Sequence, residues 1–460
     1  MKLRRTIATL ALMAFAGAQA VPSASADTVR LGLRAAVDRA VSESHLVRAG
    51  DFDVAKAGEG LRKARAQRIL PKAEVNLAGG VVPEARGDVV YSPDSSGDLG
   101  PYYRAELKLV QPLWTFGKLD ALEQLARDGV AAEEARRSLT REGVAYDAAK
   151  AYWAVAAAGR AESIAGDMRR DFDELLREVE KRLADESSGV DDADLLDVKA
   201  SAYGIDKVRL DALEARRAAG DALRALCGLP EASEPESVDE PPPAIAVDDA
   251  LFAQAAARAL AGHREVRALE AAARALAAKV ELQRRSRNPL VFLAAGAAYA
   301  YAGNRDDQDN PWVKDDFNYT RIGAEVGVSW DANLHRSGID VSEAAEEHRA
   351  LLERLAALRA KVALDVRQAL RAAARERDLL AAARASLKAA KSRLRLVLDT
   401  WETGLGEVPE VLDAYAKYYQ LRAEEPQREL ALNLALARLG YVLGDVGLYL
   451  GWVDRGKVAL

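Results

Sequence analysis

Four short stretches of the chain alternate apolar residues with polar or small ones, and two much longer stretches carry apolar residues at helical spacing. An alternation of period two is typical of a β-strand with one apolar face. Apolar positions alternate with Arg104, Glu106 and Lys108 in the second short stretch, and with glycine, Glu325 and Ser329 in the fourth. The pattern predicts strands near residues 73–82, 103–112, 290–301 and 320–330. Segments rich in Asp, Gly, Pro and Asn, at residues 83–101 and 302–318, predict long loops between the paired strands.

The two long stretches lie on either side of the middle of the chain and are rich in Ala, Leu, Arg and Glu, and no proline occurs between Pro112 and Pro230 or between Pro311 and Pro409. The first begins with a predicted helix of nearly 70 residues, which is about 100 Å long at 1.5 Å per residue, and the second with a predicted helix from about Asp340 to Thr400. After a short break the apolar stripe resumes at heptad-like spacing, so each stretch predicts an antiparallel coiled-coil hairpin. The predicted hairpin tips lie near residues 187–191 and 403–409.

The two halves of the chain repeat the same order of elements. RILPKAEVNLAG around Pro71 aligns with SRNPLVFLAAG around Pro289, and the same shift of 218 positions aligns residues 143–147 with 361–365. A constant offset across strand and helix segments indicates an internal duplication, with a linker rich in proline and glutamate between the copies. The predicted domains are a first repeat at residues 27–228, the linker at 229–246, a second repeat at 247–447 and a C-terminal tail at 448–460.

The N-terminus predicts export. Lys2, Arg4 and Arg5 precede a short apolar run and two small-x-small triplets, which together are typical of a secretory signal peptide. We expect cleavage after Ala26, so that residues 1–26 are removed. The formal charge of −6 for the whole chain becomes −9 once those three positive charges are gone.

Composition argues against several functions. Neither half has a dense basic patch, which disfavours a nucleic-acid partner. Cys227 is the single cysteine and the four histidines lie far apart, so no metal or haem motif is visible and no cofactor is expected. No stretch after the signal approaches the roughly 18 apolar residues of a membrane helix. Because no G-x-S-x-G, phosphate-loop, H-E-x-x-H or C-x-x-C motif is present, we do not expect an enzyme.

With its signal peptide and duplicated halves, the chain resembles the TolC-like outer-membrane efflux family (outer membrane factors). The turn Trp401-Glu402-Thr403-Gly404, followed by Glu410-Val411-Leu412-Asp413-Ala414, is similar to that family, and so is Gln111-Pro112-Leu113-Trp114 followed by Phe116-Gly117-Lys118. The resemblance implies a mixed α and β, mostly helical fold: a trimeric twelve-stranded transmembrane β-barrel, four strands per chain, continuous with a long α-helical coiled-coil periplasmic tunnel. It implies a location in the outer membrane of a Gram-negative bacterium.

The same resemblance implies a function and partners. The protein would be a passive homotrimeric conduit of a tripartite efflux or type I secretion system, working with a periplasmic adaptor (membrane fusion) protein and an inner-membrane pump. In the family, acidic side chains past the second tip ring the pore constriction, and the tips dock the adaptor. The matching acids here are Glu410 and Asp413, with Asp194 and Asp197 as counterparts in the first repeat. The matching tip residues are Gly189, Gly404 and Gly406; some relatives carry an arginine where Gly406 stands.

Aromatic residues near the strand ends predict interfacial girdles at the boundary between lipid and water. These residues are Tyr103, Tyr299, Tyr301 and Trp330.

Plainer explanations exist for each of these features. A soluble sandwich has the same strand alternation, although two hairpins alone leave open edges. Acids near a helix N-terminus complement the helix dipole, and glycines in a tip permit a tight turn. An exported periplasmic coiled-coil scaffold or tether without a channel is the alternative function. It explains the helices but not four strands at equivalent points of two repeats.

Overall fold

The computed structural model describes residues 28–87, 94–185, 190–238, 259, 262–308, 312 and 314–456. The predicted signal peptide lies outside these residues. The chain divides into two compact units. We call the first, made of Met1–Glu43, Ala148–Pro241 and Ala382–Leu430, the hairpin unit. We call the second, made of Ser44–Asp147, Pro242–Ala381 and Ala431–Leu460, the sheet unit.

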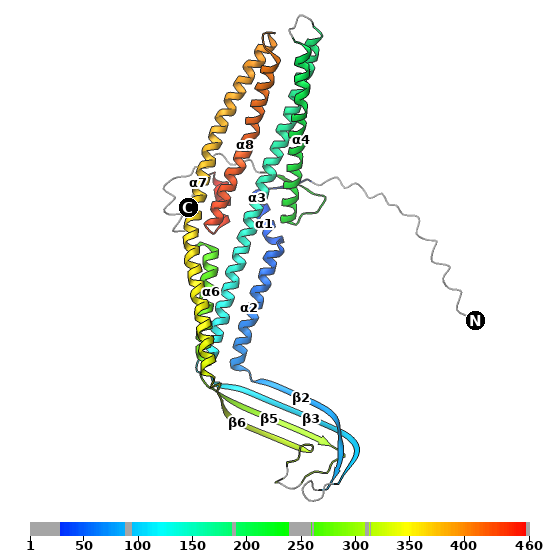
Figure 1. The fold of residues 1–460 in the computed structure, drawn as a ribbon, viewed down its shortest axis with the longest axis vertical. Coiled ribbons are helices and arrows are strands. Elements are labelled where there is room, and N and C mark those ends of the chain that lie inside the picture. The colour runs from blue at the N-terminus through cyan, green and yellow to red at the C-terminus, as the bar shows by residue number, and fades with distance from the viewer. Residues whose placement is uncertain are drawn as a thin grey trace, which may run out of the picture. The chain divides into compact units, whose positions relative to one another are not determined.

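Two helical hairpins form most of the hairpin unit (Figure 1). The first joins the later part of α3 (Lys118–Leu183) to α4 (Asp192–Cys227), and the second joins the later part of α7 (Leu334–Glu402) to α8 (Val408–Val442). Alanine and branched apolar residues recur on the facing sides of these helices, which allows close approach. The helices therefore bury a common core instead of each standing alone.

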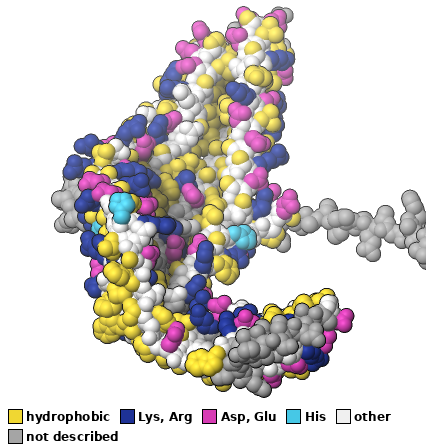
Figure 2. Space-filling model, turned by 60° about the horizontal axis from the view of Figure 1, so that its bottom comes forward, with side chains coloured by type: hydrophobic (Ala, Val, Ile, Leu, Met, Phe, Trp, Pro, Cys, Tyr) yellow, Lys and Arg dark blue, Asp and Glu magenta, His cyan; other side chains and the backbone are white. Residues whose placement is uncertain are grey.

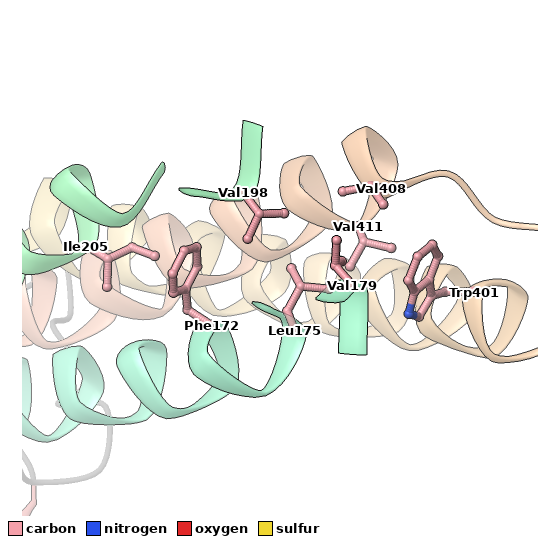
Figure 3. Packing of buried hydrophobic residues seen from close by; sticks show 8 residues of the cluster. All are labelled: Phe172, Leu175, Val179, Val198, Ile205, Trp401, Val408 and Val411. Carbon is pink, nitrogen blue, oxygen red and sulfur yellow. The ribbon is translucent and has the colours of Figure 1, made fainter. Parts of the chain in front are cut away.

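The core of the hairpin unit draws on all four helices. Figure 3 shows eight of its buried side chains pointing toward one another across the bundle. They are Phe172, Leu175 and Val179 of α3, Val198 and Ile205 of α4, Trp401 of α7, and Val408 and Val411 of α8. Burying large side chains of this kind contributes about 1.5–3 kcal/mol each, so this cluster joins the two hairpins.

A small parallel sheet also belongs to the hairpin unit and was not predicted. β1 (Thr28–Leu31) pairs with β4 (Glu234–Ser237), next to α1 (Leu33–Glu43). The linker expected at residues 229–246 is therefore ordered in its first part, and residues 239–246 lie outside the described residues. Proline and glutamate disfavour strands, but Pro235 is buried against Gly220 of α4, which holds this segment in place.

The sheet unit contains one four-stranded antiparallel sheet. Its strands are β2 (Lys72–Arg86), β3 (Asp94–Trp114), β5 (Leu290–Ala302) and β6 (Tyr319–Ser329), in the order β2-β3-β5-β6. They lie side by side and curve together (Figure 1). The loop predicted at residues 83–101 was too long, because β2 continues to Arg86 and β3 begins at Asp94. Pro83 lies next to an irregularity in the pairing, and Pro101 pairs with Val81, so the missing N–H groups are tolerated.

Strand register separates the residues of the sheet into two unlike faces. On one face Val75 lies opposite Leu107, which lies opposite Ala297, which lies opposite Ile322. The apolar side chains of this face are exposed, with Ile322 at 83%. We call it the apolar face. The other face carries Arg104, Glu106, Lys108 and Glu325 between small residues of β5, and we call it the polar face.

Helices complete the sheet unit: α2 (His45–Ile69), the first parts of α3 and α7, α6 (Arg264–Ser286), the end of α8, and α9 (Val446–Arg455). Residues 448–460, expected only as a C-terminal tail, contribute most of α9. Its Tyr449 and Trp452 are fully buried, and the Val446 N–H donates to the Glu142 carboxylate at 2.8 Å. None of the described helices is both long and apolar enough to cross a bilayer.

Charged side chains cover the helices without separating by sign. On the face that Figure 2 shows, Lys and Arg side chains are interspersed with Asp and Glu. Pairs such as Arg127–Glu123 and Arg349–Glu346 follow helical spacing. This mixture gives no broad basic or acidic surface on that face, which matches the modest net charge.

Candidate functional site at the hairpin tips

The second tip owes its shape to two glycines. Gly404 has φ +79°, a backbone conformation that side chains disfavour, so its role in the turn is conformational. A Cβ on Gly406 would lie 2.9 Å from the backbone N and Cα of Trp401, so Gly406 allows the turn to close on α7. An arginine at position 406 would not fit this backbone. Gly189 of the first tip lies outside the described residues.

Asp194 has a structural role at the start of α4. The Asp191 side chain accepts a hydrogen bond from the Asp194 N–H at 3.0 Å, and the Asp194 carboxylate accepts one from the Asp191 N–H at 3.2 Å. This reciprocal capping box satisfies two N–H groups that a helix end otherwise leaves unpaired. The structural role of Asp194 is therefore to cap the first turn of α4.

Asp413 is also paired. Its carboxylate lies 2.8 Å from the Arg393 guanidinium across the second hairpin. The Asp413 side chain is 66% exposed and the Arg393 side chain 50%. An exposed pair of this kind contributes little to stability, but it neutralises part of the Asp413 charge. Within the described residues, the carboxylates of Glu410 and Asp197 have no hydrogen bond or ion pair, and both residues are exposed.

An arginine of the first hairpin binds an aromatic residue of the second. The Arg182 guanidinium lies 4.0 Å from the centroid of the Trp401 ring and donates a hydrogen bond to the Trp401 carbonyl at 2.8 Å. Glu178, one turn earlier, holds Arg182 from the other side at 3.0 Å. Only 18% of the Arg182 side chain is exposed, so this cation–π contact is shielded from water. We call it the Arg182–Trp401 contact.

Polar pairs continue along the packing of α3 against α8. Asp171 accepts a hydrogen bond from the Tyr419 hydroxyl, Asp167 pairs with Arg422, and Arg160 pairs with Glu429. Glu429 is buried and also pairs with Arg384 at 2.6 Å, so its charge is compensated twice. Burial, followed by the nearby Asp171 and Glu174 carboxylates, raises the pKa of Tyr415 to about 12. These pairs fix the register of one hairpin against the other.

A cavity of about 580 Å³ opens between α3, α4 and α8. Most of its lining is apolar or small, and Asp413 is the only charged residue that lines it. The lining residues are Met168, Phe172, Leu175, Ala200, Ser201, Gly204, Ile205, Leu412, Asp413, Tyr415, Ala416 and Tyr419.

The four residues expected to form aromatic girdles lie in the sheet unit and are about half exposed. Tyr103 lies opposite Tyr301 on the apolar face, and Tyr299 lies two residues from Tyr301 on the same strand, near the end that carries the loops. Trp330 follows β6 at the other end, where its indole N–H donates to the Arg287 carbonyl at 3.0 Å. The structure thus places aromatic side chains at both ends of the sheet.

Sequence reasoning missed the Arg182–Trp401 contact and the polar pairs on α3 and α8. The chain has 65 Lys and Arg residues, so a single arginine in a helix carries no signal of its own.

Comparison with known proteins supports the fold and the family. Residues 255–445, less than half of the chain, match the family model described as Outer membrane efflux protein. The fold is similar to CusC, which forms a transmembrane channel (17% identity, TM-score 0.74, covering 91% of this chain and 94% of CusC). It is also similar to the outer-membrane channel CmeC of Campylobacter jejuni (14% identity, TM-score 0.72, covering 92% of this chain and 89% of CmeC). A third similar structure is the open state of the outer-membrane channel MtrE of Neisseria gonorrhoeae (18% identity, TM-score 0.70, covering 90% of this chain and 89% of MtrE).

No curated protein matches the chain in sequence. The chain has the fold of outer-membrane channels, mostly helical with one sheet. The resemblance to the TolC-like outer-membrane efflux family, predicted from the sequence, is confirmed.

Proposed function

We propose that this chain is the outer-membrane channel subunit of a tripartite efflux or type I secretion system. Three copies form a passive conduit, which takes its energy from an inner-membrane pump through a periplasmic adaptor and catalyses no reaction itself. Each copy contributes its four strands to a twelve-stranded barrel, and the hairpins of the duplicated halves form the periplasmic tunnel. The family match and the fold support this assignment.

The observation that carries the proposal is a sheet with an exposed apolar face and two outer strands. Among the described residues, β2 and β6 each pair with a strand on one side only, apart from the isolated bridge between Ala85 and Arg305, and four strands are too few to close a barrel. Open edges are not tolerated in lipid, so β6 of one copy pairs with β2 of the next. The exposed apolar face then contacts lipid, and the polar face lines a wet lumen.

The height of the apolar face fits a bilayer. From Val291, opposite Val328, to Tyr301 the strand advances ten residues, which is about 33 Å along its axis. Strands of membrane barrels are tilted by about 40°, so this length spans about 25 Å, the height of the apolar band of outer-membrane barrels. Tyr103, Tyr299 and Tyr301 then mark one boundary of the membrane, and Trp330 marks the other.

The tips supply the constriction and the surface for the adaptor. Three copies of Glu410 place unpaired carboxylates near one another in a narrow pore, which favours cations. Asp413, paired with Arg393, and Asp197 contribute less in this proposal, and Asp194 contributes least because it caps α4. The turns at Gly189, Gly404 and Gly406 present the helix ends to the adaptor.

The proposal is tested by locating and weighing the exported protein. Envelopes are fractionated, extracted in mild detergent, and the mass of the particle is measured. A trimer confined to the outer membrane is expected. A periplasmic monomer or dimer that needs no detergent would refute the channel and support the coiled-coil scaffold instead.

A further inference from the structure

The segment that follows β5 crosses the sheet instead of extending away from it. β5 is separated from β2 by β3, yet residues 304–306 form hydrogen bonds with the end of β2. The Ala85 N–H donates to the Asn304 carbonyl at 3.3 Å, and the Asp306 N–H donates to the Ala85 carbonyl at 3.2 Å. To make these bonds, the chain must pass over β3. We call residues 303–308 together with 314–318 the strap.

Gly100 marks the point where the strap crosses β3. A Cβ at this glycine would lie 2.3 Å from the Asn304 Cγ and 2.5 Å from its Nδ2, closer than atoms can approach. Asn304 is fixed there, because its side-chain N–H donates to the Val82 carbonyl of β2 at 2.9 Å. A residue with any side chain at position 100 therefore displaces the strap.

The strap lies on the polar face. Gly100 and Tyr102 alternate in phase with Arg104 and Glu106, so all four residues project to the same side of β3. The Phe317 ring of the strap packs edge-on against Tyr102, with centroids 5.7 Å apart. By contrast, the tyrosines on the apolar face at this level are about half exposed.

Several contacts hold the two arms of the strap to each other and to β2. The Arg305 guanidinium lies 4.1 Å from the centroid of the Phe317 ring and donates to the Pro83 carbonyl at 2.8 Å. Asp306 pairs with Arg86 at 2.9 Å, and the Asn318 side chain donates to the Arg305 carbonyl at 2.9 Å. These contacts hold the described residues of the strap in one position against β2, within the sheet unit.

We propose that the strap narrows the loop end of the channel from the inside. This inference rests on the proposed function, in which the polar face lines the lumen and the loop end opens to the cell exterior. Three copies then form a ring at the exit, separate from the acidic residues at the tips. The ring sets an upper limit on the size of what passes the exit, through contacts at Gly100 and Phe317.

The exit is tested by the labelling of one cysteine from outside intact cells. Cys227→Ala removes the only native thiol, and Asn76→Cys places a thiol on the polar face of β2, further into the barrel than the strap. The cells are treated with a small maleimide or with one that carries a long polyethylene glycol chain. Gly100→Val displaces the strap, and Phe317→Ala removes its aromatic contacts.

We expect the small reagent to react equally in all variants. The large reagent is expected to react about tenfold faster in Gly100→Val and in Phe317→Ala, because losing these contacts favours the displaced strap by about that factor. Gly97→Val is the matched control, since a Cβ there meets nothing within 4 Å, and it should label like the parent.

Equal rates of the large reagent in the parent and both strap variants would overturn the inference. The two variants act on different residues, so one still decides the matter if the other does not assemble. Failure of even the small reagent to reach Asn76→Cys, with no trimer in the outer membrane, would overturn the channel itself and the strap with it.

Discussion

The hairpin unit and the sheet unit bury their apolar residues by different means. The hairpin unit packs Trp401, Val179 and Val198 inside its own bundle, where each is at most 4% exposed. The sheet unit leaves Ile322 at 83% and Leu77 at 77% exposed, and none of the described residues forms a second layer over its apolar face. The hairpin unit also leaves single apolar side chains exposed, such as Tyr203 and Leu405, but it buries a core of its own, whereas the apolar face of the sheet is exposed along its strands. This difference, more than any motif, supports the proposed channel subunit over a coiled-coil scaffold.

The largest effect is expected from emptying the core of the hairpin unit. Trp401→Ala removes a buried ring that packs in the core and carries the Arg182–Trp401 contact, so it should cost about 3–5 kcal/mol. Thermal unfolding of the purified protein, followed by circular dichroism, measures the loss. Trp312→Ala, at a position 94% exposed, is the control. Equal melting temperatures for the two variants would mean that the core does not join the hairpins.

A charge on the apolar face should distinguish lipid from water. Ile322→Arg is nearly neutral if this face is in water, but it costs about 2–4 kcal/mol if it faces the middle of a bilayer. We expect a marked loss of trimer from the outer membrane, measured by unboiled gel electrophoresis of envelopes. Gly323→Arg places the same charge on the polar face, where a Cβ meets nothing within 4 Å, and should assemble normally. Equal yields of the two variants would argue for a sheet in water.

A smaller effect is expected from the Arg182–Trp401 contact alone. Arg182→Met keeps the length of the side chain but removes its charge and hydrogen bond, so we expect a loss of about 1–2 kcal/mol. Arg177→Met on the same helix is the matched control, because among the described residues this arginine bonds only to the carbonyl of Asp173. Denaturant unfolding of both variants measures the difference. If Arg182→Met is no less stable than its control, the contact contributes nothing to the packing of the hairpins.

The smallest effect on stability, and the most specific effect on function, is expected at the acids of the second tip. Glu410→Gln should weaken block of the channel by divalent cations in planar bilayers, with melting temperature and trimer yield unchanged. Asp413→Asn should act more weakly, because Arg393 already compensates that carboxylate. Unchanged conductance and block in the double variant would refute an acidic constriction at this tip.

Much of the fold follows from contrasts between faces that are visible in the sequence. Arg104, Glu106 and Lys108 alternate with apolar residues because the two faces of β3 differ, and the structure places these three on one side. The long helices follow equally from their apolar stripes and lack of proline. Here the local pattern and the tertiary structure agree, so a single sequence suffices.

Other elements depend on contacts between distant residues and have no local pattern. β1 and β4 form strands because they pair with each other, although some 200 residues of sequence separate them. The charged residues of β4 make its sequence resemble a linker. The ends of β2 and β3 were hidden by Pro83 and Pro101, which occur at places where the lost N–H is tolerated. Of the predicted site residues, Asp413 has a partner on another helix that only folding reveals, Asp194 pairs locally with Asp191, and Glu410 has no partner among the described residues.

The outer strands β2 and β6 have a consequence for the chain before the proposed assembly. A single subunit carries outer strands of 15 and 11 residues, and an open backbone edge accepts any strand that arrives first. The concentration of unassembled subunits must therefore stay low, because wrong pairing between strand edges increases with the number of unassembled chains. If the proposed trimer is correct, a cell that overproduces this protein should accumulate aggregates before it gains channels, and the rate of synthesis must match the rate at which the three copies meet.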